Sequence, residues 1–257
     1  MEIHDLMNLK GRNALVTGGS QGIGKAIALG LAEYGANVII HYHSNHEVAN
    51  QTLEALQSFP IQSGAVAANL AQRESIGKIS EYCHATLGHI DILVLNASIQ
   101  HRRYWQDITY EEFEEQVNVN LRSTLFLIQQ FVPPMRENSW GRVITIGSVQ
   151  QQRPHPEMTV YSATKSAMEN LVISLAPDLA SDRITINNIA PGAIRTGRNE
   201  KVLQDKAYYN KVIQHIPLKE VGEPVDCAGI CVLLASEAGR YFTGENIFVD
   251  GGMRLPT

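Results

Sequence analysis

The sequence has few cysteines, few aromatic residues and no large excess of either charge. It has three cysteines among 257 residues, and so small and odd a number favours a reducing compartment over a disulfide framework. The formal net charge is −5 without any basic block, which argues against nucleic acid or an anionic membrane as a partner. No apolar run approaches the length of a membrane span, and we see no secretory signal. We therefore expect a cytoplasmic protein that binds a small molecule.

Two groupings of metal-ligand residue types occur, and neither predicts a metal site. Cys227 and Cys231 lie four apart in the apolar stretch DCAGICVLLA, where we expect two small buried hydrophobes. His41, His43 and His46 fall within six residues, and strand alternation would put the first two on one face. No cysteine or carboxylate pair accompanies them. We expect an ordinary polar strand end and no metal.

Short apolar runs alternate with longer amphipathic stretches, a pattern typical of βα units around a parallel sheet. The strand candidates are residues 13–17, 37–42, 64–69, 91–96, 142–147, 184–190 and 246–250, and the helix candidates lie near 22–34, 46–58, 72–87, 111–137, 159–180 and 224–236. No linker or repeat divides the chain, so we predict one α/β domain over residues 1–257 with about seven parallel strands. The polar segment 191–219 is the one long insertion, and we expect it to cover a substrate.

Glycines cluster between the first predicted strand and the first predicted helix, in TGGSQGIG (17–24). Glycine there lets the backbone approach a pyrophosphate, whose charge is attracted by the free amides of a helix start. The spacing of Gly18, Gly22 and Gly24 differs from the commoner G-x-G-x-x-G, and many other strand-to-helix turns contain glycine. Because this run opens the first βα unit, we expect it to bind a dinucleotide.

The end of the second predicted strand lacks the carboxylate that would hold the 2′-hydroxyl of NAD. Tyr42, His43, Ser44 and Asn45 stand there instead, and none of them repels the 2′-phosphate of NADP. Ser44, Asn45 and a partly protonated His43 would donate to that phosphate, although no arginine is present to clamp it. These residues favour NADP and do not exclude NAD.

Tyr161 and Lys165 lie four positions apart in VYSATKSAM, on one face of a predicted helix. A lysine ammonium one turn away favours phenolate over phenol, so such a pair can transfer a proton near neutral pH. The same spacing occurs in helices where both side chains are simply solvated. Ser148 supports proton transfer because it follows a strand, where ligands of parallel sheets collect. Asn120, in apolar VNVNL, would either hold a water or be a plain buried amide.

With these residues in place, the sequence resembles the short-chain dehydrogenase/reductase family over essentially the whole chain. The matching motifs are TGGSQGIG (17–24), NA (96–97), NL with Asn120, Ser148, YSATK (161–165), PGAIRT (191–196) and FTGENIFVDGG (242–252). The resemblance implies a Rossmann-type doubly wound sheet with helices on both faces. It also implies an NAD(P)-dependent oxidoreductase that interconverts a secondary alcohol and a ketone by hydride transfer, and a homotetramer.

By that resemblance, Asn120, Ser148, Tyr161 and Lys165 form a catalytic tetrad. Tyr161 would be the acid in reduction and the base in oxidation, Ser148 would orient the carbonyl, Lys165 would also bind the nicotinamide ribose, and Asn120 would anchor a water. The implied cofactor-binding residues are Gly18, Ser20, Gln21, Gly22, Ile23, Gly24, Tyr42, His43, Ser44, Asn69, Leu70, Asn96, Ala97, Ser98, Tyr161, Lys165, Pro191, Gly192, Ile194 and Thr196.

Two positions depart from the family pattern. LNAS stands where the family usually carries N-N-A-G, so Ser98 adds a Cβ at a usual glycine and puts the local loop shape in doubt. Asn69 stands at the end of the third predicted strand, where family members commonly carry an Asp that contacts adenine. The Asn69 amide can both donate and accept in that contact.

The segments expected to wall the substrate, 98–105, 148–158 and 192–216, are rich in hydrogen-bond formers. They carry Gln100, Arg102, Trp105, Gln150, Gln152, Arg153 and His155, of which at least half face water if these are surface loops. We expect Ser148, Gln150, His155 and Tyr161 to contact the substrate. A group left unpaired on binding costs about 1–3 kcal/mol, so a polar wall favours a hydroxylated substrate such as a sugar or polyol.

Two alternative functions stay open. A 3-oxoacyl-(acyl carrier protein) reductase needs a basic face for its acidic carrier. Arg136 and Arg142 flank the fifth predicted strand, but Pro177 and Asp178 stand where such a reductase tends to carry a basic residue, which weakens this alternative. A non-catalytic NAD(P)-binding sensor could dispense with the proton donor, which this chain retains.

Overall fold

The strands form one parallel sheet. A computed structural model describes residues 2–197 and 199–256 of the chain. The strands are β1 (Asn13–Thr17), β2 (Asn37–Tyr42), β3 (Ser63–Ala67), β4 (Ile92–Leu95), β5 (Gly141–Ile146), β6 (Ile184–Pro191) and β7 (Asn246–Val249). Their order in the sheet is β3-β2-β1-β4-β5-β6-β7, and neighbouring strands pair in parallel throughout. The predicted Rossmann-type sheet is confirmed.

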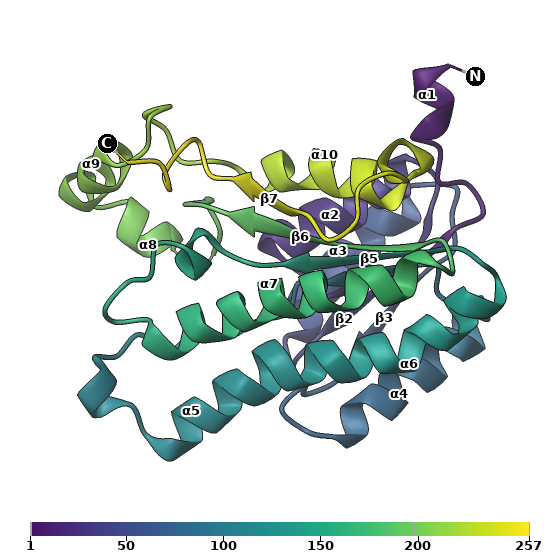
Figure 1. The fold of residues 1–257 in the computed structure, drawn as a ribbon, viewed down its shortest axis with the longest axis horizontal. Helices are drawn as coiled ribbons and strands as arrows, with labels where there is room; N and C mark the ends of the chain where they lie inside the picture. Colours follow the sequence, from purple (N-terminus) through teal and green to yellow (C-terminus); the bar gives the residue numbers. More distant parts are fainter. Residues whose placement is uncertain (1, 198, 257) are drawn as a thin grey trace.

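Helices cover both faces of this sheet (Figure 1). The helices are α1 (Ile3–Leu6), α2 (Gly22–Glu33), α3 (His46–Gln57), α4 (Glu74–Leu87), α5 (Tyr110–Val117), α6 (Ser123–Glu137), α7 (Thr159–Ala180), α8 (Glu200–Leu203), α9 (Lys206–Gln214) and α10 (Pro224–Ala235). Helices α4, α6 and α7 pack their apolar residues into one core, and α2, α3 and α10 pack theirs into another. No helix in residues 2–197 and 199–256 is long and apolar enough to cross a membrane.

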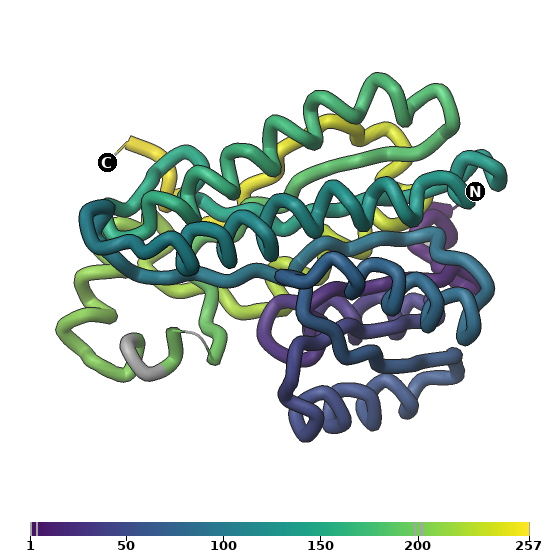
Figure 2. Tube along the Cα trace, turned by 90° about the horizontal axis from the view of Figure 1, so that it is seen from below, coloured from purple at the N-terminus to yellow at the C-terminus, as the bar shows by residue number. Residues whose placement is uncertain are grey.

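The central strands are buried on both faces and contribute apolar residues to both cores. Leu15 of β1 and Leu93 of β4 lie in the first core, while Val16 and Val94 of the same strands lie in the second. Since all strands run parallel, their carboxyl ends meet at a single edge, and the segments that follow them gather there. Helices α8 and α9 lie at this end of the molecule (Figures 1 and 2).

Two segments differ from the sequence expectation. The helix predicted over 111–137 is interrupted by a π-helical turn at Asn118–Arg122, in which the Ser123 N–H bonds the Asn118 carbonyl five residues back. The insertion 191–219 is less irregular than expected, because it contains α8 and α9 and buries Ile194, Leu203 and Ile216. Arg198, inside this insertion, lies outside the described residues.

Candidate active site

The glycine segment between β1 and α2 folds as a tight turn. Gly22, the first residue of α2, has φ +55°, a conformation that favours glycine. A Cβ on Gly24 would lie 2.2 Å from the carbonyl oxygen of Gly18, so any other residue would force the turn to shift. The turn therefore brings bare backbone and the start of a helix to the carboxyl edge of the sheet. That is the cradle a dinucleotide pyrophosphate requires, and the residues present fit the cofactor.

Two side chains hold this glycine turn against β4. Asn96 Nδ2 donates to the carbonyl oxygens of Thr17 (2.9 Å) and Gly18 (3.0 Å). Thr17 Oγ1 in turn accepts from the backbone N–H groups of Asn96 (3.0 Å) and Ala97 (3.1 Å). Asn96, predicted as a cofactor-binding residue, thus uses its amide to fix the shape of the turn.

His41 supports the same turn from β2, and sequence reasoning missed this role. Its ring is 2% exposed; Nδ1 accepts from the Gly18 N–H at 3.2 Å and Nε2 lies 3.0 Å from the Ala68 carbonyl. A carbonyl can only accept, so the ring is neutral with its proton on Nε2. Burial, partly opposed by the Ala68 bond and reinforced by His43, lowers the pKa of His41 to about 4. The one signal in the sequence was a histidine inside the apolar run NVIIHY.

The end of β2 separates residues that the sequence grouped together. The strand stops at Tyr42, so His43 is exposed and does not share a strand face with His41, contrary to the alternation argument. Asn45 caps α3 by accepting from the Val48 N–H at 3.2 Å. His43 and Ser44 remain exposed at the carboxyl edge, where a 2′-phosphate would approach.

The other predicted cofactor residues also follow strand ends. Asn69 and Leu70 come after β3, with the Asn69 Oδ1 atom closing a turn by accepting from the Ala71 N–H at 2.9 Å. Half-buried Ser98 follows β4. Thr196, after β6, comes close to the glycine turn: a Cβ on Gly22 would lie 3.3 Å from its Cγ2. The remaining ones, Ser20, Gln21 and Ile23 in the glycine turn and Pro191, Gly192 and Ile194 at and after the end of β6, lie at the same edge.

Tyr161 and Lys165 lie on the buried face of α7, against the end of β5. Tyr161 is 7% exposed and Lys165 is 1% exposed. Lys165 Nζ donates to the carbonyl of Ile146 at 2.6 Å and sits 5.6 Å from the centre of the Tyr161 ring. A buried ammonium beside a phenol matches the predicted pair, and the solvated alternative does not describe these side chains.

Asn120 connects three segments of the site. Its Oδ1 accepts from the Ile99 N–H at 2.8 Å, and its Nδ2 donates to the Ile99 carbonyl at 2.9 Å and to Thr164 Oγ1 at 3.1 Å. The segment after β4 is thereby tied to α7 one residue before Lys165. The π-helical turn carries Asn120, fully buried, at this junction.

Ser148 follows β5 by two residues and caps the 3₁₀ turn η3 (Val149–Gln151). Its Oγ accepts from the Gln150 N–H at 3.2 Å, and its own N–H donates to Gln151 Oε1 at 3.2 Å. The hydroxyl hydrogen is therefore free of the capping bond and can point to a ligand. Through the Ile146 carbonyl and Lys165, this strand end is joined to the helix that carries Tyr161.

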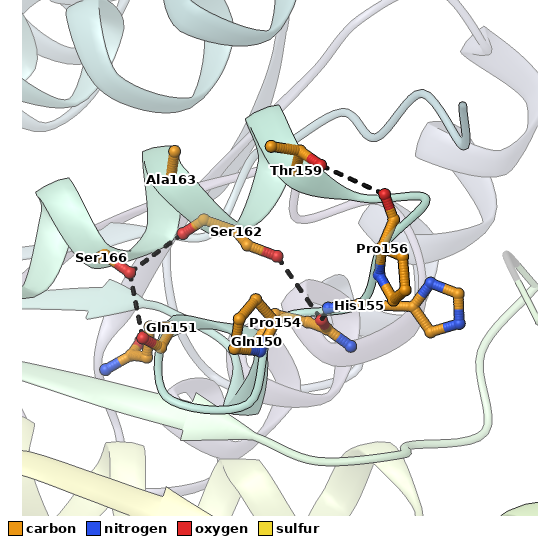
Figure 3. Close-up of a pocket in the computed structure, with 9 residues that line it drawn as sticks. All are labelled: Gln150, Gln151, Pro154, His155, Pro156, Thr159, Ser162, Ala163 and Ser166. Carbon is orange, nitrogen blue, oxygen red and sulfur yellow. Dashed lines mark hydrogen bonds between the residues drawn. The ribbon is translucent and has the colours of Figure 1, made fainter. Parts of the chain in front are cut away.

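Gln150 and His155, both predicted to contact substrate, line a pocket of ≈ 480 Å³ between η3 and the start of α7 (Figure 3). Gln150 Oε1 accepts from the His155 N–H at 2.7 Å. The pocket is lined by Gln150, Gln151, Pro154, His155, Pro156, Thr159, Ser162, Ala163 and Ser166. Neither Ser148 nor Tyr161 lines this pocket.

Comparisons with known proteins agree with this arrangement. A family model described as enoyl-(acyl carrier protein) reductase matches residues 18–254. The 5-keto-D-gluconate 5-reductase of Escherichia coli is 34% identical over 252 residues, which cover 98% of each chain. A crystal structure of a 3-oxoacyl (acyl-carrier-protein) reductase from Agrobacterium tumefaciens with NADP bound superposes with a TM-score of 0.92 at 36% identity, covering 98% of this chain and 97% of that one.

A gluconate 5-dehydrogenase from Burkholderia cenocepacia, in complex with NADP and tartrate, has a TM-score of 0.92 at 30% identity over 100% of both chains. Both the family match and these relatives span nearly the whole sequence. The chain is therefore an NAD(P)-dependent oxidoreductase acting on CH–OH groups, and it belongs to the short-chain dehydrogenase/reductase family.

Proposed function

We propose that this enzyme interconverts a ketone and a secondary alcohol on a polyhydroxylated acid of the gluconate type, with NADP as its cofactor. The single observation that supports this most is the buried pair of Tyr161 and Lys165 on α7, where Lys165 bonds the last carbonyl of β5 at the carboxyl edge of the sheet. The relatives that act on gluconate and 5-ketogluconate supply the substrate class.

NADP is favoured by the chemistry of the β2 end. His43 and Ser44 are exposed there, and no carboxylate lies between β2 and the first residue of α3 to repel a 2′-phosphate. The two solved relatives described above were crystallised with NADP. When bound, the dinucleotide supplies or accepts a hydride at its nicotinamide ring.

The chain's own residues handle the proton. In reduction, the Tyr161 hydroxyl donates a proton to the substrate oxygen while the Ser148 hydroxyl donates a hydrogen bond to the same oxygen. The Lys165 ammonium beside the ring favours the phenolate that remains. Asn120 holds the segment after β4 against α7, and we propose that it also anchors the water that returns the proton.

Of the two arginines in the expected substrate wall, Arg102 has its charge offset by Glu157, so Arg153 is the cation that would suit an acid. Arg102 is bonded to Glu157 and to Tyr208 of α9. Both bonds raise the pKa of Arg102, and the bond to Glu157 raises it more. Arg153 donates to the Met253 carbonyl. We propose that the insertion 191–219, through this contact between Tyr208 and Arg102, covers the bound substrate and completes the single domain of residues 1–257.

The acyl-carrier alternative has less support. Arg136 is paired with Asp178 (2.5 Å) and Asp182 (2.9 Å), so its charge is offset. Arg142 is buried and paired with Glu237 at 3.1 Å. Neither guanidinium is left to form a basic face for an acidic carrier protein.

We also propose a cytoplasmic homotetramer. Exposed apolar side chains lie on the outer faces of α5, α6 and α7 (Phe113, Phe126 and Ile173) and just before β7 (Tyr241), and pairing of subunits would bury them. The three cysteines are free thiols, which suits a reducing compartment. Light scattering after size exclusion at micromolar concentration tests the assembly, and a monomer would contradict it.

The function is tested by mixing the pure protein with NADPH or NADH and a panel of 5-ketogluconate, other keto-sugars and an acetoacetyl thioester. We expect NADPH oxidation with 5-ketogluconate and its loss in Tyr161→Phe, with exposed Tyr110→Phe at the start of α5 as the matched control. Preference for the thioester would favour the acyl-carrier function. Binding of NADPH without turnover of any ketone would favour the sensor.

A further inference from the structure

A closed ring of polar side chains lies behind Ser148. Gln151 Nε2 donates to Glu169 Oε2 at 2.8 Å, and Asn246 Nδ2 donates to Glu169 Oε1 at 2.7 Å. Asn188 Nδ2 closes the ring by donating to Gln151 Oε1 (3.2 Å) and to Asn246 Oδ1 (2.7 Å). The ring thus joins η3, α7, β6 and β7. The proton transfer from Tyr161 does not itself use any of these four groups.

The carboxylate of Glu169 sets the direction of every bond in the ring. A carboxylate only accepts hydrogen bonds, so both neighbouring amides must turn their NH₂ groups toward it. The carbonyl oxygen of Gln151 then points the other way, where it accepts from the backbone N–H of Ser148 at 3.2 Å. An amide flip at Gln151 would place two donors against each other at this position.

The surroundings leave the ring little freedom. Thr145 Oγ1, on β5, donates to Asn188 Oδ1 at 2.6 Å and so fixes that amide independently. A Cβ on Gly147 would lie 2.4 Å from Gln151 Oε1 and 2.5 Å from Asn188 Nδ2. The ring therefore presses against the backbone of the residue that precedes Ser148.

We propose that Glu169 and Gln151 are positioning residues that hold the backbone of Ser148, and with it the direction of the Ser148 hydroxyl toward the substrate oxygen. Glu169 acts by orienting the Gln151 amide, and Gln151 acts through its bond to the Ser148 N–H. This inference rests on the role proposed above for Ser148.

The first test is Glu169→Gln, which keeps the size of the side chain and adds one unwanted donor. We expect kcat for 5-ketogluconate to fall about 10–100-fold, because a small misplacement of a reacting group is costly, while the affinity for NADPH stays at the wild-type value. The matched control is Glu81→Gln on the exposed side of α4, which should keep the wild-type kcat.

The second test exchanges the two groups in the double variant Gln151→Glu with Glu169→Gln. The carboxylate now at position 151 would accept from Ser148 and Asn188. The amide now at position 169 would donate to that carboxylate and accept from Asn246. Every pair keeps one donor and one acceptor, so kcat should recover most of the loss. Equal loss of kcat and melting temperature in the single and exchanged variants would show a merely structural ring and overturn the proposal.

A third measurement needs no substrate and separates this inference from the proposed function. Amide hydrogen exchange at Ser148 should be about tenfold faster or more in Glu169→Gln than in the wild type, since the Gln151 oxygen is no longer held toward that N–H, and slow again in the exchanged variant. Unchanged exchange at Ser148 would overturn the inference. Failure of the wild type to reduce any ketone would instead overturn the proposed function, and the exchange rates would still decide the role of the ring.

Discussion

Replacing His41 with Gln tests whether a neutral buried imidazole supports the cofactor turn. The wild-type ring accepts from Gly18 and bonds the Ala68 carbonyl only while it carries a single proton. Gln keeps a donor for Ala68 but loses the titratable group. The variant should therefore differ from the wild type in how stability depends on pH.

The magnitude follows from the pKa of His41, which burial lowers from 6.5 to about 4. Between these values His41 binds a proton in the unfolded chain but not in the folded one, so the free energy of unfolding falls as the pH drops from about 6.5 to about 4. Integrated from pH 7 to pH 5, the loss is about 2 kcal/mol. Below pH about 4 the folded ring is protonated as well, and the loss stops growing.

The assay is urea unfolding at fixed protein concentration, from pH 7 to pH 5, for the wild type and His41→Gln. The gap between the two free energies of unfolding should change by about 2 kcal/mol over this range, with the wild type losing more. His84→Gln, at an exposed position on α4, controls for loss of a histidine. Parallel curves for the wild type and His41→Gln would refute the reasoning.

Three further outcomes are expected. Tyr161→Phe should lower kcat about 10²–10⁴-fold in a stopped-flow assay, while a fluorescence titration should show unchanged NADPH binding. An undiminished kcat would contradict the role of Tyr161 as the acid. Gly24→Ala should lower the free energy of unfolding by about 1–3 kcal/mol and weaken NADPH binding, because its Cβ meets the Gly18 carbonyl. The control Gly77→Ala adds a Cβ that meets nothing within 4 Å, so it should raise the melting temperature. Burial raises the pKa of Cys83 and of Cys227 to about 12, so a thiol reagent should label them only when the chain unfolds; rapid native labelling would contradict this.

Much of the fold could be read from local pattern. β1, β2 and the bounds of α7 match their predicted residues, because a strand buried on both faces is mostly apolar and a helix repeats its apolar residues every three or four positions. The π-helical turn at Asn118–Arg122 escaped this reasoning, since one extra residue in a helix leaves the composition of the segment unchanged. The helices inside 191–219 escaped it because their stretches are short and polar.

The residues of the site divide in the same way. The sequence by itself determined the glycine turn, the Tyr161 and Lys165 spacing and the missing carboxylate after β2, because each depends on neighbours within a few positions. Only the tertiary structure decided that His41 holds Gly18, that Asn120 bonds Ile99 and Thr164, and that Glu169 orients Gln151. These partners are 18 to 44 positions apart in the chain, and they meet because the strand order brings distant strand ends to one edge of the sheet. Hydrogen bonds act over about 3 Å in space, and no local pattern records which distant residues will be that close.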